Sequence, residues 1–371
     1  MKYKIIFTAL IPLSLLLIWI SHLNPAATEI LFSTTIYRAY TAIYGRVFGL
    51  LPFSIAQFGI IIIPLAGLIY VLVKLAQLIQ SRGQRGKLAI HLLLNIFSAV
   101  GILLFMFTIG AGLNYGRIMF GESIGLQVRQ SSQQELAVLA EIIVENVNRY
   151  APKVARNPQG HMIVEAANHR ALSNQAREIF RDSAEDFPVL AGFVPHVKPI
   201  WYSRLFSHMR ITGIFVPWTL EPHVNVDVMD YHIPATMLHE LAHFRGVMLE
   251  DEANFVGWIV GHYSDNICFK YSSNMLALSH VLNQLGRANP REHQRIAATI
   301  HPGARTDRYY NWHYWQQFEG PVAEVARTAN NAYLRANRQQ DGVQSYGRVV
   351  DLLLAYYREE IAARLAAGFA E

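Results

Sequence analysis

The sequence predicts an α+β protein in which three N-terminal membrane-spanning helices precede a mostly helical domain with a small sheet. Long apolar runs occur in the first third of the chain, and short alternations rich in Val, Ile, Phe and Trp occur in residues 195–230. Apolar residues at helical spacing occupy much of the remainder. An order of helices, a few strands and then more helices is typical of the α+β class.

Residues 1–119 are predicted to form a membrane anchor. The chain is 52% hydrophobic and 16% charged, whereas soluble domains carry roughly a quarter charged residues. The apolar surplus lies in three runs, at about residues 5–23, 50–75 and 88–113, and about 20 apolar residues suffice for a helix to cross a bilayer. Lys2 and Lys4 also suit a secretory signal, but no small-residue cleavage site follows, so we expect a retained span.

The distribution of charge predicts the orientation of the chain. Residues 1–119 hold nine basic side chains and one acidic side chain, for a net +8, and residues 120–371 hold 23 basic and 26 acidic ones, for a net −3. Basic residues cluster between the second and third runs, so we expect this link and the N-terminus to be cytoplasmic. Three crossings then place residues 120–371 outside the inner (cytoplasmic) membrane, with the lipid bilayer as partner. Because this larger part is mildly acidic, we expect no nucleic-acid partner.

Residues 120–371 are expected to form one extracytoplasmic domain. Ser132-Gln-Gln-Glu135 is a capping box, which predicts a helix that runs to about Tyr150. We further expect helices at residues 166–186, 234–245, 321–338 and 346–365, and strands at residues 211–217 and 223–228. The single cysteine, Cys268, excludes an intrachain disulfide.

Residues 239–243 contain an H-E-x-x-H motif. On a helix, positions i and i+4 lie on one face, so His239 and His243 can bind one Zn²⁺ while Glu240 reaches the metal's water. Pro234 suits the first turn of such a helix and Gly246 suits its end. The motif therefore predicts one zinc ion with Glu240 as the catalytic base. The alternative is that both histidines are partly buried residues of an amphipathic helix.

A catalytic zinc site uses three protein ligands and an open position for water, and the acidic residues after the motif supply the third. In glutamate-type zinc peptidases a second helix carries a ligand Glu and, four residues later, an Asp or Asn that orients a ligand histidine. Glu250 and Asn254 match this spacing. Glu252 is the alternative ligand, because side chains two residues apart on a helix point about 200° apart and only one can face the metal. We favour Glu250.

Six segments carry a resemblance to a known family: Phe215–Trp218, Val224–Asp227, His239–Gly246, Glu250–Phe255, Tyr333–Asn337 and Gln340–Asp351. They resemble an uncharacterised bacterial family of membrane-anchored proteins, catalogued as domain of unknown function 3810 and interpreted as zinc metallopeptidases. The resemblance covers nearly the whole chain, including the N-terminal spans. It implies a zincin-like metallopeptidase core and supports His239, Glu240 and His243. It implies no substrate and does not choose between Glu250 and Glu252.

These observations predict a membrane-anchored, zinc-dependent metallopeptidase that hydrolyses peptide or protein substrates of the cell envelope. Zinc would lower the pKa of its bound water, and Glu240 would pass the water's proton to the leaving amine. Tyr333, Arg335 and Tyr346 are candidate hydrogen-bond donors to the oxyanion. The strand expected at residues 223–228 could align an extended peptide by edge pairing. The alternative function is a catalytically silent receptor, sensor or scaffold with a zincin fold that binds zinc.

Overall fold

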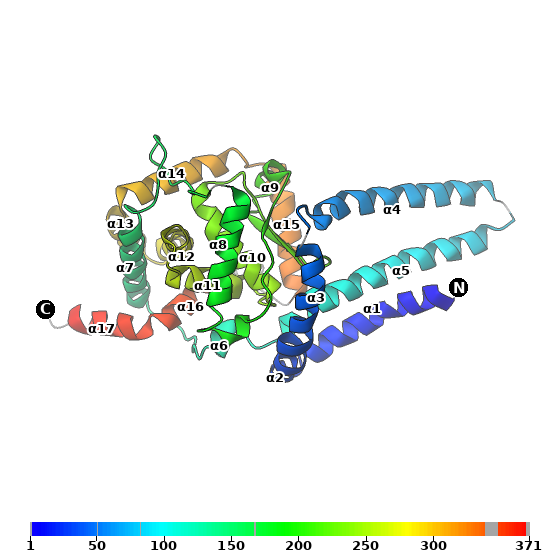
Figure 1. The fold of residues 1–371 in the computed structure, drawn as a ribbon, viewed down its shortest axis with the longest axis horizontal. Coiled ribbons are helices and arrows are strands. Elements are labelled where there is room, and N and C mark those ends of the chain that lie inside the picture. Colours follow the sequence, from blue (N-terminus) through cyan, green and yellow to red (C-terminus); the bar gives the residue numbers. More distant parts are fainter. Residues whose placement is uncertain (1, 50, 82, 167, 338–347, 369–371) are drawn as a thin grey trace. The chain divides into compact units, whose positions relative to one another are not determined.

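The computed structural model describes residues 2–49, 51–81, 83–166, 168–337 and 348–368, and the chain divides into two compact units. The first unit comprises the residues up to Ile118 together with Val216–Glu221, and the second unit comprises the rest. The described chain is mostly helical and contains one small sheet (Figure 1). The predicted mixture of many helices with a few strands is therefore confirmed.

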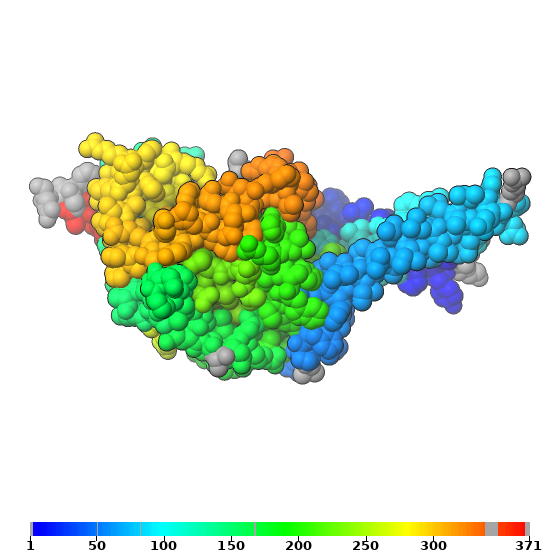
Figure 2. All heavy atoms as spheres, turned by 90° about the horizontal axis from the view of Figure 1, so that it is seen from above, coloured from blue at the N-terminus to red at the C-terminus, as the bar shows by residue number. Residues whose placement is uncertain are grey.

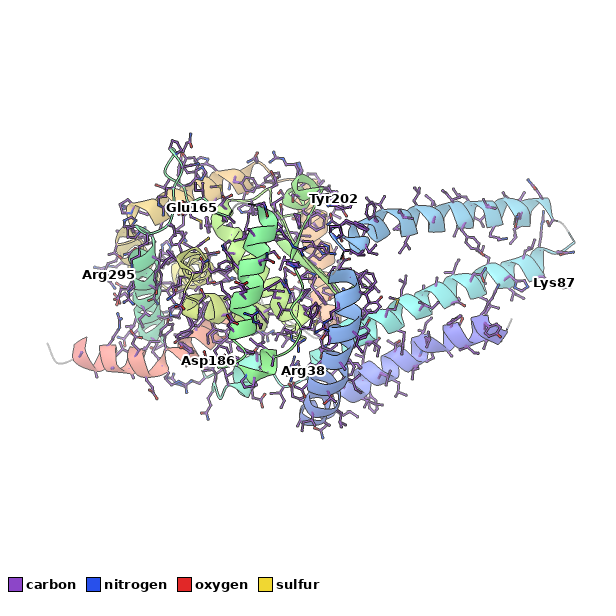
Figure 3. All side chains as sticks on the ribbon, viewed as in Figure 1. Arg38, Lys87, Glu165, Asp186, Tyr202 and Arg295 are labelled. Atoms are coloured by element: carbon purple, nitrogen blue, oxygen red, sulfur yellow. The ribbon has the colours of Figure 1, made fainter. Side chains whose placement is uncertain are left out.

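The first unit contains three helices that are long and apolar enough to cross a membrane, close to the three predicted spans, which indicates a membrane protein. These helices are α1 (Lys2–Ser21), α4 (Ile55–Gln80) and α5 (Arg85–Gly110). The unit also contains α2 (Pro25–Thr28), the π-helix η1 (Glu29–Ile36), α3 (Tyr37–Gly49) and the 3-10 helix η2 (Gly112–Gly116). Within this unit, Figure 3 shows Arg38 on α3 and Lys87 near the start of α5, at opposite ends of the spans.

The second span begins later than predicted, at Ile55 rather than near residue 50. The side chain of Ser54 accepts a hydrogen bond from the backbone N–H of Gln57 (3.1 Å), so Ser54 is the N-cap. A capping serine satisfies a first-turn N–H group that has no partner inside the helix, and this sets where the helix starts. The third span ends at Gly110 and not near residue 113, because the chain tightens there into η2.

Glu221 binds the N-terminus of α4 within the first unit. Its carboxylate is 1% exposed and accepts hydrogen bonds from the backbone N–H groups of Ala56 (2.7 Å) and Ile55 (3.2 Å) and from the Ser54 hydroxyl (3.4 Å). A carboxylate is favourable here because the first N–H groups of a helix lack internal partners and the helix dipole attracts negative charge. Glu221 thereby ties Val216–Glu221 to the start of the second span.

The second unit is built around α12 (Ile267–Ala288), against which α7, α10 and α11 pack. Figure 1 shows α12 nearly end on, and Figure 2 shows α13 and α14, in yellow and orange, on one outer face of the unit. The helices of this unit are α6 (Phe120–Ser123), α7 (Gln133–Tyr150), α8 (His169–Asp182), α9 (Ser203–His208), α10 (Ile233–Phe244), α11 (Glu250–Tyr263), α12, α13 (Pro290–Ala298), α14 (Pro302–Gln316), α15 (Pro321–Ala336), α16 (Val349–Tyr356) and α17 (Arg358–Gly368), with short 3-10 turns η3 (Pro188–Leu190) and η4 (Asp230–His232).

The sheet has three short strands in the order β1-β3-β2. They are β1 (Lys198–Pro199), β2 (Gly213–Val216) and β3 (Glu221–Val224), and β1 runs parallel to β3 with Lys198 opposite His223. The expected strand at residues 223–228 is therefore central, so the prediction that it pairs with a peptide at an edge is wrong. It also ends at Val224, because the Asn225 side chain accepts a hydrogen bond from the N–H of Asp227 (2.8 Å) and turns the chain.

Most of the helices predicted for the second unit are present at the expected positions. The capping box between Ser132 and Glu135 begins α7, which ends at Tyr150 as predicted. The prediction of one helix at residues 346–365 is wrong, because the described part of that stretch is divided at Tyr357 into α16 and α17.

Replacement of Glu221 by Ala should destabilise the first unit. The change leaves the first-turn N–H groups of α4 without their carboxylate acceptor, and hydrogen bonds to a charged group contribute about 2 kcal/mol. We expect a lower midpoint of thermal unfolding for the full chain in detergent, with Glu221→Gln intermediate because its amide oxygen still accepts. Glu319→Ala, at an exposed glutamate, is the control and should stay at the parental midpoint. Equal midpoints for Glu221→Ala and Glu319→Ala would show that this contact does not stabilise the chain.

Candidate metal site

The candidate site is formed by α10 and α11 and by the tight turn that joins them. Gly246 ends α10 in the left-handed region, with φ of +85°. Its N–H donates to the carbonyl of His243 (2.9 Å), and the N–H of Val247 donates to the carbonyl of Ala242 (3.0 Å). This is the Schellman pattern, in which glycine is favoured because it has no Cβ to clash. The reversal brings the start of α11, at Glu250, back to the histidines of α10.

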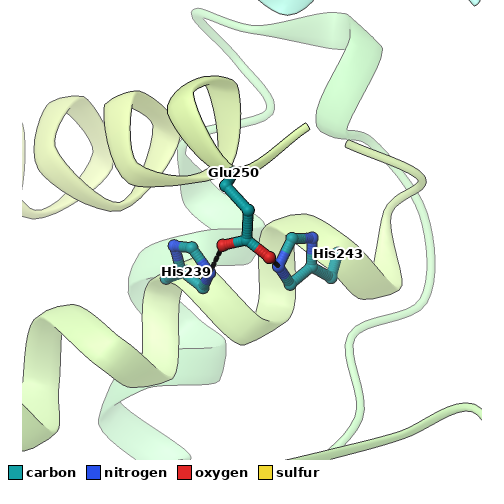
Figure 4. Close-up of side chains that lie close together, drawn as sticks. All are labelled: His239, His243 and Glu250. Atoms are coloured by element: carbon teal, nitrogen blue, oxygen red, sulfur yellow. Dashed lines mark ion pairs between the residues drawn. The ribbon is translucent and has the colours of Figure 1, made fainter. Parts of the chain in front are cut away.

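His239, His243 and Glu250 meet at this turn. The distance from His239 Nε2 to one carboxylate oxygen of Glu250 is 3.3 Å, and His243 Nε2 lies 3.7 Å from the other oxygen (Figure 4). Two ligands of a tetrahedral metal at bond lengths of about 2.1 Å lie about 3.4 Å apart. The three donors lie within 4.8 Å of one another and could hold a metal ion. Their side chains are only 10–18% exposed, so the cluster is largely buried.

The backbone sets the orientation of the His243 ring. Its Nδ1 lies 2.8 Å from the carbonyl oxygen of Val247. Because a carbonyl can only accept, Nδ1 carries the proton, and Nε2 of the neutral ring keeps a lone pair that faces Glu250. Metal-binding histidines commonly donate their second ring N–H to a carbonyl in this way. Sequence reasoning assigned no role to Val247, since a backbone carbonyl leaves no residue-type signal.

The three consecutive acidic residues at the start of α11 point to different partners. Glu250 faces the two histidines. The Asp251 carboxylate lies 3.2 Å from the guanidinium of Arg348. Glu252 accepts a hydrogen bond from the backbone N–H of Gly121 (2.8 Å). The geometry therefore brings Glu250 to the histidines and directs the alternative ligand, Glu252, to another part of the second unit.

Glu240 lies buried beside strand β2 and is 3% exposed. A Cβ atom at Gly213 would lie 2.4 Å from its Oε1, so the carboxylate occupies the space that a side chain in β2 would fill. Its Oε2 has no hydrogen-bond partner among the residues that the structure describes. A buried oxygen without a partner is costly and calls for a ligand or water. Sequence reasoning missed Gly213, although a glycine within a strand pattern can indicate close approach of another group.

Burial is the largest single influence on the pKa of each titratable side chain in the motif. It raises the pKa of Glu240 to about 8, while the charge of His239 acts in the opposite direction. It lowers the pKa of His243 to about 4, with a further lowering by His239. Burial also lowers the pKa of His239, but the interactions with Glu250, Glu240 and Asn254 together outweigh it, so the net pKa is raised. A cation among these groups would favour the ionised carboxylates.

Three of the four remaining predicted site residues lie on two helices, α11 and α15. Asn254 is buried on α11, close enough to His239 to contribute to raising its pKa. Tyr333 and Arg335 are exposed on α15, and Tyr346 lies outside the described residues. A role as a hydrogen-bond donor to a reacting group stays a prediction for Tyr333, Arg335 and Tyr346.

Comparison with known proteins identifies one family. The family model described as Protein of unknown function (DUF3810) matches residues 32–354, which include the candidate site and two of the three spans. No curated protein and no solved structure matches the chain.

Replacement of Gly246 by Ala should both destabilise the chain and misorient His243. The left-handed conformation costs a residue that has a Cβ about 1–2 kcal/mol. Relaxation of the turn would also move the Val247 carbonyl away from Nδ1 of His243. We expect a lower thermal midpoint and weaker binding of divalent zinc, measured by calorimetry on the purified full chain.

The control for this prediction is Gly286→Ala, in the interior of α12. The nearest atom to a Cβ there is 3.4 Å away and belongs to a side chain, so alanine should be neutral or slightly stabilising because it favours a helix. A Gly246→Ala protein that binds zinc as tightly as the Gly286→Ala protein would contradict the role assigned to the turn.

Proposed function

The chain belongs to the family described as Protein of unknown function (DUF3810), and from the site itself we propose that it is a membrane-anchored, zinc-dependent peptidase. The observation that carries the proposal is the meeting of His239, His243 and Glu250, with their donor atoms within 4.8 Å of one another. Two imidazoles and one carboxylate are the protein ligands of zinc in glutamate-type peptidases. The proposal includes a zincin-like fold for the second unit.

Three features of the chain support zinc as the metal. The separations of 3.3 and 3.7 Å between imidazole and carboxylate atoms match a tetrahedral arrangement. The hydrogen bond from His243 to the Val247 carbonyl leaves Nε2 free to donate a lone pair. The buried, unpartnered oxygen of Glu240 is suited to bind a water molecule in the open position.

In the proposed mechanism, zinc held by these side chains would polarise a peptide carbonyl and make a water molecule acidic near neutral pH. Glu240 accepts the proton of the attacking water and delivers it to the nitrogen of the leaving amine. His239 and Glu250 both influence its pKa, so Glu240 shares the electrostatic environment of the cluster. The Val247 carbonyl restricts the ring of His243, and Asn254 contributes to raising the pKa of His239.

Strand β2 supports a peptide as the substrate. It is an edge strand of the described sheet, and its first residue, Gly213, lies directly against Glu240. An extended peptide that paired with β2 would receive main-chain hydrogen bonds and pass close to the proposed base. We therefore assign to β2 the edge pairing with an extended peptide that the sequence suggested for residues 223–228.

The proposed location follows from the charge of the link between α4 and α5. Arg85 and Lys87 lie at the start of α5, and Lys74 lies near the end of α4. Short basic links remain in the cytoplasm, so we place the N-terminus there. The second unit would then act on peptides or proteins outside the inner membrane.

The choice of ligand can be tested with a matched pair of variants. Glu250→Gln should weaken zinc binding at least about tenfold, because a neutral amide replaces a charged ligand. Glu252→Gln should bind zinc like the parent, since its amide oxygen can still accept from Gly121. The measurement is zinc content and affinity of the purified full chain, with His239→Ala as the zinc-free reference.

Two outcomes would contradict the proposed ligands. Loss of zinc in Glu252→Gln but not in Glu250→Gln would reverse the assignment. A parent chain that holds no zinc, when purified without chelators and supplied with zinc, would remove the metal from the proposal altogether.

The catalytic role of Glu240 is tested separately. Glu240→Gln should keep about one zinc ion but lower peptide cleavage by about 10²–10⁴-fold, because it removes the proton acceptor and not a ligand. Cleavage can be measured with a peptide library, and substrates can be sought by comparing the envelope proteins of cells with parent or Glu240→Gln protein. Zinc binding by both proteins with no cleavage by the parent would favour the receptor or scaffold function.

A further inference from the structure

The link between α1 and α4 is almost entirely helical and exposes a row of large apolar side chains. The elements α2, η1 and α3 follow one another without interruption from Pro25 to Gly49. The exposed apolar side chains are Ile30 (65%), Leu31 (65%), Ile36 (56%), Ile43 (73%) and Val47 (58%). We call these five residues the link stripe. A helix on the surface of a water-soluble protein turns such residues toward the core.

Several polar groups of the link are turned inward and are bonded there. Glu29 and Arg117 form an ion pair at 2.6 Å, with side chains only 13% and 7% exposed. The hydroxyl of Ser33 donates to the amide oxygen of Asn114 (2.8 Å), and that of Tyr37 donates to the carbonyl of Gly110 (3.2 Å). Polar groups inside and apolar groups outside is the arrangement expected where the surrounding medium cannot form hydrogen bonds.

The threonine hydroxyls of the link are also hydrogen-bonded within the protein. Each of the four donates its hydroxyl to a backbone carbonyl, at 2.6–3.0 Å, and these are Thr28, Thr34, Thr35 and Thr41. Such bonds satisfy a hydroxyl without water. The link can therefore be placed in an apolar medium without leaving these groups unsatisfied.

The orientation of α3 argues against a fourth span. It runs across the direction of α1, α4 and α5 in Figure 1. The link also contains Glu29, Arg38 and Arg46, and it is absent from the three helices that are apolar enough to cross. Thr35 on η1 and Arg46 on α3 are exposed beside the row formed by Ile36, Ile43 and Val47. An apolar row bordered by polar side chains is typical of a helix that lies in a membrane surface.

Aromatic rings form a second row along α3. The rings of Tyr40 and Tyr44 stack with centroids 5.0 Å apart, and Tyr44 contacts Phe48 at 4.8 Å. The indole N–H of Trp218, in the same unit, donates to the carbonyl of Leu103 near the end of α5 (3.0 Å). Tyrosine and tryptophan are enriched where lipid chains meet head groups.

We propose that residues 25–49 form a membrane-surface element, with the link stripe embedded among the lipid chains at the face of the bilayer where α1 ends and α4 begins. The occupant is the bilayer and not a second protein, because the link stripe is continuous along the chain with the lipid-facing surfaces of α1 and α4. The anchor is therefore broader than three spans. The proposal does not depend on zinc binding or catalysis.

The test measures membrane depth with nitroxide labels. Cys268, the only cysteine, is replaced by Ala, and single cysteines are introduced by Ile43→Cys and Val47→Cys in the link stripe and by Thr35→Cys at its edge. The full chain is reconstituted in vesicles of phosphatidylethanolamine and phosphatidylglycerol. Labels at the first two sites should lose collisions with a water-soluble nickel complex and gain collisions with oxygen, and the label from Thr35→Cys should be shallower.

Two reference labels calibrate the depths. Ile62→Cys lies on α4 and is 57% exposed, so it reports the hydrocarbon. Arg181→Cys lies on α8, where the parent side chain is 65% exposed, and reports water. Values for Ile43→Cys and Val47→Cys equal to that of Arg181→Cys would overturn the proposal. Spin–spin broadening at these sites that disappears on dilution with unlabelled protein would show that a second copy covers the link stripe.

A second measurement uses the parent chain, so it does not depend on whether the labelled variants fold. A photoreactive diazirine carried by a lipid should modify residues 30–47 as well as α4, and mass spectrometry locates the adducts. Adducts on α4 without any on residues 30–47 would place the link outside the bilayer and overturn the proposal.

Discussion

Because α11 begins at Glu250, only a few residues after α10 ends at Phe244, the chain must reverse tightly to bring this carboxylate to the two imidazoles of α10. The left-handed turn at Gly246 provides that reversal. It sets the carbonyl of Val247 against His243 and returns the chain so that α11 begins with Glu250 at the cluster. The large core around α12 holds both helices in place. The candidate site thus depends on one backbone conformation that glycine adopts at little cost.

The first unit follows a different constraint, which is the absence of water in a bilayer. Its outer surface is apolar, and several of its buried polar groups are paired with one another, as Glu29 is with Arg117. The same constraint explains why a carboxylate, Glu221, satisfies the first N–H groups of α4. Because an unsatisfied backbone group is costly near hydrocarbon, such contacts determine where a span can begin.

Much of the fold and half of the candidate site could be predicted from local patterns. Apolar runs indicated the three spans, and the capping box at Ser132 indicated the start of α7. The i, i+4 spacing indicated that His239 and His243 share a face. The start of α4 was missed because apolar residues before Ser54 continue the run, and only the cap shows where the helix begins. The limits of β3 were missed because a side-chain turn ends the strand.

The sequence by itself determined which segments are apolar, which are helical and which residues carry metal-binding groups, because these properties depend on residue type and spacing within one element. It favoured Glu250 and kept Glu252 as the alternative, since both lie in the first turn of the same helix. The tertiary structure separated the two carboxylates: the backbone N–H of Gly121 binds Glu252, and the two histidines face Glu250. It also placed Gly213 against Glu240. Both results depend on contacts between elements distant in the chain, which no local pattern records.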